Sequence, residues 1–279
     1  MQGTDSQATL GSPLGRTSDY VDVYTPSLLH SIPRQESRDR MGVRSEPLPF
    51  MGEDVWTAYE LSWLDGKGRP RIGALRMTIP ASSPAIVESK SMKLYLNSFA
   101  QTRFNHSADV LKTLNSDLTL AFRAPILVDF LSPAALANIA NALPGQCLDE
   151  LDTEIDCYEY NPELLQVDQS SFDVKEAVHT RAFRSLCPVT GQPDWAALVV
   201  QYAGAPIQRE SLYRYLVSFR SHTGFHEATV EQVYLDLLQR CGCERLSVWA
   251  RFMRRGGIDI NPHRSNWDAS APLIRLAAQ

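Results

Sequence analysis

The chain has 279 residues, of which 44% are hydrophobic, and it carries a formal net charge of −5. The hydrophobic content is sufficient to fold about two domains, whereas the acidic balance argues against a general nucleic-acid-binding surface. No apolar stretch approaches the roughly 18 residues of a membrane span. Five cysteines, an odd number, fit a reducing cytoplasm better than a disulfide scaffold.

Residues 1–45 are rich in Ser, Thr, Arg, Gln, Gly and Pro and show no regular hydrophobic periodicity. We therefore expect a tail that packs on the edge of a domain or stays mobile. Beyond it, apolar residues alternate from Val55 to Trp63 and again from Leu75 to Ile79, with a turn at 65–70 between them. This pattern predicts that the folded part opens with a β-hairpin.

The segment 87–99 predicts an amphipathic helix, because its apolar residues follow the i, i+3, i+4, i+7 spacing: Met92, Tyr95, Leu96 and Phe99. Glu88, Ser89 and Lys90 lie at the start of this helix, where backbone N–H groups are unpaired and the helix dipole favours anions. The same three residues are equally compatible with a solvated helix start that binds nothing.

The remainder of the first half predicts a helix over about 107–120, a strand over 126–131, a weakly helical Ala-rich stretch over 133–150 and a strand over 157–168. In the second half, strands are expected at 177–186, 195–202, 246–252 and 273–276. Helical faces run from Leu212 to Phe219 and from Val230 to Leu238, and Cys241-Gly242 is a helix stop.

The two halves repeat each other. A shift of 120 positions takes Met92 to Leu212, and it also aligns Tyr95 with Tyr215, Phe99 with Phe219, His106 with His226 and Val110 with Val230. We therefore predict an α+β fold of two β-β-α-α-β-β modules, 46–170 and 171–279, each with an antiparallel sheet covered by helices on one face.

A loop between two expected strands carries the reactive side chains. Pro188, Gly191 and Pro193 interrupt regular structure between Cys187 and Asp194. A thiolate is a strong nucleophile when a base is near it, and a carboxylic acid opposite it can donate or accept a proton. Taken alone, the loop is also compatible with a small buried Cys187 and a turn-forming Asp194.

The copies differ where chemistry could occur. The first has Glu88-Ser89-Lys90 where the second has Gln208-Arg209-Glu210, and only the second has the Cys187 loop and Phe225-His226-Glu227. This division predicts a composite site to which each copy contributes one half.

Taken together, these motifs resemble the NADPH-dependent 7-cyano-7-deazaguanine reductases, in their longer, two-module form. The resemblance runs from about residue 45 to the end of the chain. It rests on the stretch Glu88 to Tyr95, the Cys187-to-Asp194 loop, His226-Glu227 and the stretch Arg254 to Pro262.

The resemblance implies two tandem tunnelling-fold (T-fold) modules, a homodimer and a role in queuosine biosynthesis, a tRNA modification. It also implies reduction of the nitrile of 7-cyano-7-deazaguanine to 7-aminomethyl-7-deazaguanine by NADPH. The sequence has no Gly-x-Gly-x-x-Gly after a strand, so basic residues are expected to hold the nucleotide phosphates. The partner is thus a small deazapurine, not nucleic acid or a membrane.

The resemblance also assigns residue roles. Cys187 would form a covalent thioimide with the nitrile, Asp194 would protonate the nitrile nitrogen and His226 would donate a proton near the later imine. Residues expected to bind the substrate are Val87, Glu88, Ser89, Phe225, His226 and Glu227. Residues expected to bind NADPH are Ser89, Lys90, Arg255 and Gly256.

Other functions remain open at the level of sequence. A zinc-dependent cyclohydrolase of the same fold requires metal ligands, but Cys241-x-Cys243 has no second ligand pair, so no metal is expected. A thiol hydrolase could add water to the nitrile through Cys187. A purine-binding module without activity is a third alternative, although the full set of candidate catalytic residues argues against it.

Overall fold

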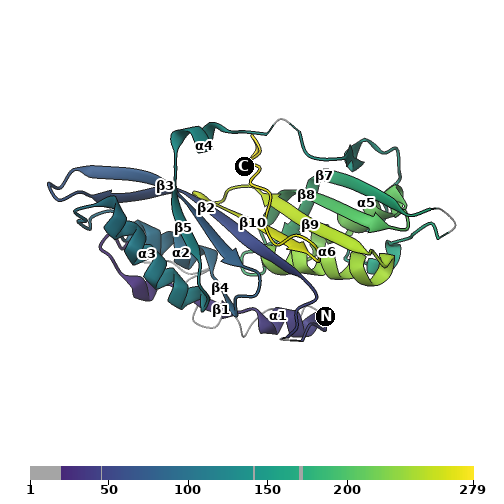
Figure 1. Ribbon diagram of the computed structural model, residues 1–279, viewed down its shortest axis with the longest axis horizontal. Coiled ribbons are helices and arrows are strands. Elements are labelled where there is room, and N and C mark those ends of the chain that lie inside the picture. The colour runs from purple at the N-terminus through teal and green to yellow at the C-terminus, as the bar shows by residue number, and fades with distance from the viewer. Residues whose placement is uncertain (1–19, 45, 141, 170–171) are drawn as a thin grey trace. The chain divides into compact units, whose positions relative to one another are not determined.

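The computed structural model describes residues 20–44, 46–140, 142–169 and 172–279 (Figure 1). It is an α+β protein with mainly antiparallel strand pairing, as predicted. The chain forms two compact units. Unit 1 comprises Met1–Glu46, Val55–Asn138 and Arg254–Ile260, and unit 2 comprises Pro47–Asp54, Ile139–Met253 and Asn261–Gln279. The module boundaries predicted from the sequence repeat, 46–170 and 171–279, are a separate division of the chain from these two units, and they stay a prediction.

Unit 1 is built on the predicted hairpin, β2 (Met51–Leu64) and β3 (Pro70–Pro80). It continues through β4 (Ala85–Val87), α2 (Ser89–Asn97), α3 (Ser107–Phe122), β5 (Leu127–Leu131) and α4 (Pro133–Ala137). Its strands follow the order β5-β3-β2, and β5 pairs antiparallel with β3 so that Phe130 lies opposite Leu75. The apolar faces predicted for both helices are buried in one core with the inner face of the hairpin.

Unit 2 repeats this order of elements. It contains β6 (Gln146–Cys147), β7 (Val174–Leu186), β8 (Pro193–Gly204), α5 (Arg209–Ser218), α6 (His226–Cys241) and β9 (Arg245–Phe252). It also contains most of β10 (Ile258–Ser265), from Asn261 onward. The strand order is β10-β9-β8-β7-β6, and all neighbours pair antiparallel except β6 with β7. Gly242, with φ of 61°, ends α6 as the sequence predicts.

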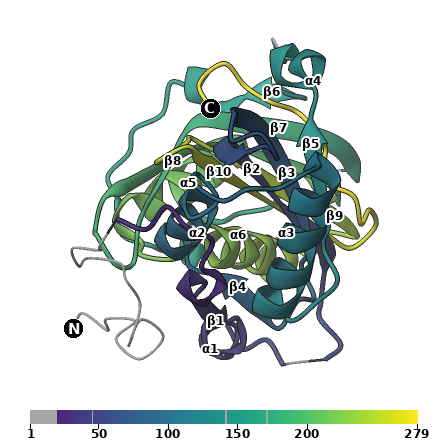
Figure 2. The same cartoon turned by 90° about the vertical axis from the view of Figure 1, so that its left-hand side faces the viewer.

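Residues 20–44 form part of unit 1 and contribute a short strand and two short helices to it. A 3-10 helix, η1 (Pro26–Leu28), is followed by β1 (Ser31–Pro33), which pairs with β4, and by α1 (Gln35–Arg40) (Figures 1 and 2). The Tyr24 hydroxyl donates to Asp117 Oδ2 at 2.7 Å, as does the Tyr95 hydroxyl. The described part of the expected tail therefore packs on unit 1, whereas residues 1–19 lie outside the described residues.

A 3-10 helix and two tyrosines that share one aspartate also occur in unit 2, where a strand was predicted for the segment 157–168. That prediction is wrong: the segment contains η3 (Pro162–Leu164), begun by the Asn161 side chain, which accepts from the Glu163 N–H at 3.0 Å. The Tyr160 and Tyr215 hydroxyls both donate to Asp236, at 2.9 and 2.5 Å. These side-chain bonds, rather than a strand ladder, hold the segment in place.

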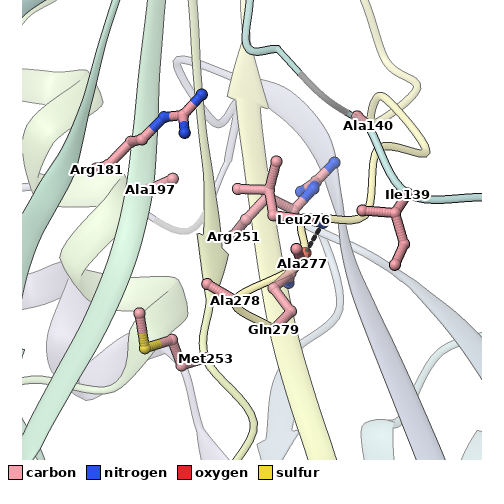
Figure 3. Close-up of a pocket in the computed structure, with 10 residues that line it drawn as sticks. All are labelled: Ile139, Ala140, Arg181, Ala197, Arg251, Met253, Leu276, Ala277, Ala278 and Gln279. Atoms are coloured by element: carbon pink, nitrogen blue, oxygen red, sulfur yellow. Dashed lines mark hydrogen bonds between the residues drawn. The ribbon is translucent and has the colours of Figure 1, made fainter.

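Three further expectations differ from the structure. The helix predicted over 133–150 is limited to the five residues of α4. No strand forms over 273–276, where the Arg251 guanidinium donates to the carbonyls of Pro272 and Ile274. Arg251 and Leu276 both line the pocket drawn in Figure 3. Strand β10 was not predicted. It is buried along its whole length, polar residues included, so it has no alternating hydrophobic pattern.

One buried residue of β10 predicts a pH dependence of stability. Burial, together with the positive charge of Arg264, lowers the pKa of His263 to about 4. Between pH 6.5 and 4 the unfolded chain binds a proton here that the folded chain does not, so stability is lost as pH falls through this range. We expect this histidine to lower the free energy of unfolding by about 2–3 kcal/mol between pH 7 and 4.5.

Urea unfolding of His263→Gln at both pH values tests this expectation, because glutamine is neutral throughout. The variant should lose about that much of the pH dependence, while His106→Gln, at an exposed position, should keep it. Equal pH dependence in His263→Gln and the unchanged protein would contradict the assignment.

Candidate active site

The Cys187 loop is a tight connection between two long strands of unit 2. Strand β7 ends at Leu186 and β8 begins at Pro193. The Cys187 N–H donates to Gln192 O at 2.9 Å and the Gly191 N–H donates to Cys187 O at 3.0 Å. Gly191 has φ of 64°, which favours glycine. The loop is closed by backbone bonds, so the partly exposed thiol is held at a defined position.

Asp194 and His226, which were predicted to have separate proton-transfer roles, are neighbours in the structure. Asp194 is the second residue of β8, is only 4% exposed and lies opposite Ser185. His226 Nε2 lies 3.3 Å from Asp194 Oδ2. The imidazole stacks in parallel on the Phe252 ring, with centroids 3.9 Å apart and 7° between the planes. The ring is thus oriented from its face by Phe252 and at its edge by the carboxylate.

Backbone contacts also hold the histidine beside the loop. The Leu186 N–H donates to His222 O at 2.8 Å, and the Gly224 N–H donates to Leu186 O at 3.1 Å. Leu186 directly precedes Cys187, and Gly224 lies two residues before His226. Helix α6 therefore starts next to the thiol-bearing loop, although 39 positions separate Cys187 from His226 in the sequence.

Phe225 and Glu227 flank the histidine. Phe225 is the half-buried N-cap residue of α6. Glu227 lies in the first turn and is 3% exposed, where the helix dipole stabilises a carboxylate. The sequence missed Phe252 as a site residue. It was predicted only as part of a strand, since nothing local indicates that it lies under His226.

In unit 1, Glu88 is the N-cap of α2 and is fully buried. Its Oε1 accepts from the Lys90 N–H at 2.6 Å and its Oε2 accepts from the Ser91 N–H at 2.9 Å. Burial raises the pKa of Glu88, and these two backbone bonds partly oppose the rise. The neighbouring Val87 is buried in β4, and the Ser89 hydroxyl lies 3.4 Å from Glu88 Oε1.

The predicted cofactor residues gather on one part of unit 1. The turn between Arg255 and Ile258 is closed by the Arg255 N–H donating to Ile258 O at 3.0 Å. Gly256 has φ of 58°, and a Cβ there would lie 3.0 Å from Lys93 Cδ. Lys93 was not predicted as a site residue, although it lies three positions after Lys90 on the same helix face. The turn and the start of α2 together present cations and a close backbone approach, which are features that a nucleotide phosphate requires.

The structure thus brings Asp194 and His226 together within unit 2, and the Gly256 turn and Lys93 together within unit 1. Whether Glu88 and His226 contact one ligand concerns both units and stays a prediction. Among the described residues, no group of His, Cys, Asp and Glu could hold a metal ion. No helix in the described ranges is long and apolar enough to cross a bilayer.

Comparison with known proteins identifies relatives along almost the whole chain. The family model "Nitrile reductase, 7-cyano-7-deazaguanine-reductase N-term" matches residues 20–130, and the model "QueF-like protein" matches residues 193–271. The NADPH-dependent 7-cyano-7-deazaguanine reductase of Hydrogenovibrio crunogenus is 46% identical, with 96% of each chain covered. The proteins of the same name from Chromobacterium violaceum and Bordetella avium are 48% and 49% identical, covering 96% of this chain and 96% and 98% of theirs.

Proposed function

This chain belongs to the family of NADPH-dependent 7-cyano-7-deazaguanine reductases, and from that premise we propose how its residues perform the reaction. The enzyme converts 7-cyano-7-deazaguanine, two NADPH and two protons into 7-aminomethyl-7-deazaguanine and two NADP+, a step of queuosine biosynthesis. The observation that carries the residue assignment is the pairing of Asp194 with His226 at 3.3 Å, next to the closed Cys187 loop.

The first step is addition of the Cys187 thiol to the nitrile. The sulfur forms a bond to the nitrile carbon, one π bond of the nitrile opens, and its electron pair takes a proton on nitrogen. The product is a thioimide that contains every atom of both reactants. Asp194 supplies the proton to nitrogen and takes up the proton that the thiol loses, so that it ends the step protonated as it began. Its buried carboxyl lies at the start of the strand that follows the loop.

NADPH supplies two hydrides: the first precedes expulsion of the thiolate from the carbon, and the second reduces the imine that results. His226 delivers a proton to the imine nitrogen and Asp194 holds the imidazole edge in the required orientation. Phe252 limits rotation of the ring from below.

Substrate recognition falls to residues of both units. Glu88 and Glu227 are carboxylates matched to the ring N–H and amino donors of a guanine-like edge, and Phe225 stacks on the heterocycle. Glu88 is already fixed by two backbone N–H donors, so it offers its remaining lone pairs without reorganisation. We propose that both sets of residues act on the same substrate molecule.

At the level of architecture, we propose two tandem T-fold modules, 46–170 and 171–279, and a homodimer in the cytoplasm. The matching hydrogen bonds of Tyr24, Tyr95 and Asp117 in unit 1 and of Tyr160, Tyr215 and Asp236 in unit 2 support the duplication. Sedimentation of the purified chain tests the dimer.

Cofactor binding by unit 1 gives a prediction. Lys90→Ala and Arg255→Ala should each raise the Michaelis constant for NADPH about tenfold, because each removes a charge-assisted contact to phosphate. The Michaelis constant for the nitrile should change much less. Lys112→Ala removes an exposed cation from α3, a different helix, and is the matched control. Equal effects on both substrates would show that the two cations act elsewhere.

Turnover itself is tested by mixing the protein with 7-cyano-7-deazaguanine and NADPH and following NADPH absorbance together with the product. The expected result is consumption of two NADPH per amine formed. Nitrile loss without NADPH oxidation would indicate a thiol hydrolase, and ring opening of a purine that depends on added metal would indicate a cyclohydrolase.

A further inference from the structure

Unit 1 contains a counterpart of the Cys187 loop. The Asp65 N–H donates to Arg69 O at 2.9 Å and the Gly68 N–H donates to Asp65 O at 2.8 Å. This is the bonding pattern of Cys187, Gly191 and Gln192 in unit 2, shortened by one residue. Asp65 therefore stands where the second copy has its thiol.

The neighbouring segment matches as well. The Leu64 N–H donates to Thr102 O at 2.9 Å, and the Phe104 N–H donates to Leu64 O at 2.9 Å, as Leu186 is bonded to His222 and Gly224. By this match His106 stands in place of His226. Arg71, the second residue of β3, stands in place of Asp194, the second residue of β8.

These differences between the two loops remove the thiol and the acid that the proposed nitrile reduction needs, and they add positive charge. The position of the nucleophile holds a carboxylate, and the position of the buried acid holds an arginine. Lys67, Arg69 and Arg71 are exposed, and the two arginines have 63% and 49% of their side chains accessible. These three residues line a groove beside the loop, and Asp65 is the one acidic residue in its lining. With three cations and one carboxylate, this part of unit 1 has a net charge of +2, in a chain whose net charge is −5.

Asp65 prearranges the arginines. Its Oδ1 accepts from the Lys67 and Arg69 N–H groups at 2.9 and 3.0 Å, and its Oδ2 accepts from Arg69 Nε at 2.9 Å and from Arg71 Nη2 at 3.0 Å. Backbone donation from Arg69 is the main reason that the pKa of Asp65 lies well below its usual range. Each guanidinium keeps further N–H donors for a ligand.

The loop and the start of α3 enclose a groove of about 650 Å³, within the size range of small-ligand sites. Its apolar lining comes from Trp63, which stacks on Phe130 with centroids 5.4 Å apart, and from Phe104, which stacks on Phe99 at 5.5 Å. The first helical residue, Ser107, also lines it. The groove therefore combines cations with aromatic surface.

We propose that this groove is a second ligand site, which binds a nucleoside monophosphate, with the phosphate on Arg69 and Lys67 and the heterocycle on Phe104. Arginine matches a phosphate dianion in geometry and charge. The site is wholly within unit 1 and does not depend on the residues assigned to the reaction.

Calorimetric titration of the full chain with AMP, and with adenosine as the uncharged analogue, tests the proposal. AMP should bind at least about tenfold more tightly than adenosine, and Lys67→Ala combined with Arg69→Gln should weaken AMP binding at least about tenfold. Arg40→Gln is the matched control, because Arg40 is also an exposed arginine paired with an acid four positions away, Glu36. It should leave AMP binding unchanged.

Asp65→Asn separates a ligand site from a merely structural turn. Asparagine keeps an oxygen that can accept from the two backbone N–H groups but removes the charge that competes for the arginines, so AMP should bind several-fold more tightly. Equal binding of AMP and adenosine, or equal affinity in the Arg69 and Arg40 variants, would overturn the proposal. AMP binding that is lost in Lys90→Ala and kept in Arg69→Gln would also overturn the proposal, because AMP would then bind at the residues assigned to NADPH. A single-stranded oligonucleotide that binds more tightly than AMP through Arg69 would replace the small ligand with a polymer and also overturn it.

Discussion

Replacing Cys187 with alanine is expected to abolish both turnover and formation of a covalent adduct. The unchanged protein, mixed with 7-cyano-7-deazaguanine in the absence of NADPH, should gain the mass of one whole nitrile molecule per chain, because addition expels no leaving group. The adduct should disappear when NADPH is added. We expect turnover in the variant to fall by at least about 10⁴-fold, since no other group in the loop can form the thioimide. Intact-protein mass spectrometry and NADPH consumption measure the two effects.

The other cysteines provide the controls. Burial raises the pKa of the Cys241 thiol to about 12 and that of the Cys243 thiol to about 11, so neither supplies thiolate near neutral pH. Cys157, a partly exposed thiol outside any motif, is the matched position. Cys157→Ala should keep adduct and turnover. An adduct that persists in Cys187→Ala, or normal turnover by that variant, would exclude the covalent mechanism and favour direct hydride transfer.

Substitution of Asp194 by asparagine is expected to have the second largest effect. The amide keeps the size of the side chain but cannot supply the proton that the nitrile nitrogen takes up, and it replaces the carboxyl oxygen 3.3 Å from His226 Nε2. We expect the rate of adduct formation to fall by about 10²–10⁴-fold. Substrate affinity should change little, because the residues assigned to the heterocycle remain. Stopped-flow measurement of adduct formation and equilibrium binding of the nitrile separate the two quantities.

His226→Gln distinguishes the roles of the pair. If Asp194 is the proton donor for addition and His226 acts on the imine, His226→Gln should form the adduct at nearly the normal rate yet complete turnover slowly. Asp194→Asn should be slow already at addition. Adduct formation at the normal rate in Asp194→Asn would remove this carboxyl from the first step. The protein fold is then checked by far-UV circular dichroism of both variants.

Much of this protein could be predicted from local pattern. Alternation of apolar residues located both hairpins, and helical spacing located α2, α3, α5 and α6, because these elements each bury one face in their own unit's core. The loop around Cys187 was recognisable from Pro188, Gly191 and Pro193, which interrupt the strands on either side. The repeat was visible because equivalent core positions need residues of similar volume.

Other features depend on contacts between distant parts of the chain. The segment 157–168 carries strand-like residues but is held as η3 by Tyr160 and Asn161, whose partners include the distant Asp236. Strand β10 is concealed by its buried polar residues, such as Arg264, whose charge is satisfied by Asp54 and Glu231 in unit 2. A sequence window of ten or twenty residues does not contain these partners, so propensity gives the wrong element or none.

The sequence by itself therefore determined the order of most helices and strands, the internal sequence repeat and the choice of Cys187 as the candidate nucleophile, because each depends on residue type and spacing along the chain. Tertiary structure alone decided that His226 lies on Phe252 and against Asp194, that Gly256 meets Lys93, and that Asp65 occupies the position of the missing thiol. These juxtapositions arise from strand register and from backbone bonds between separate loops. A side chain's neighbours across such contacts are not encoded in its own local pattern.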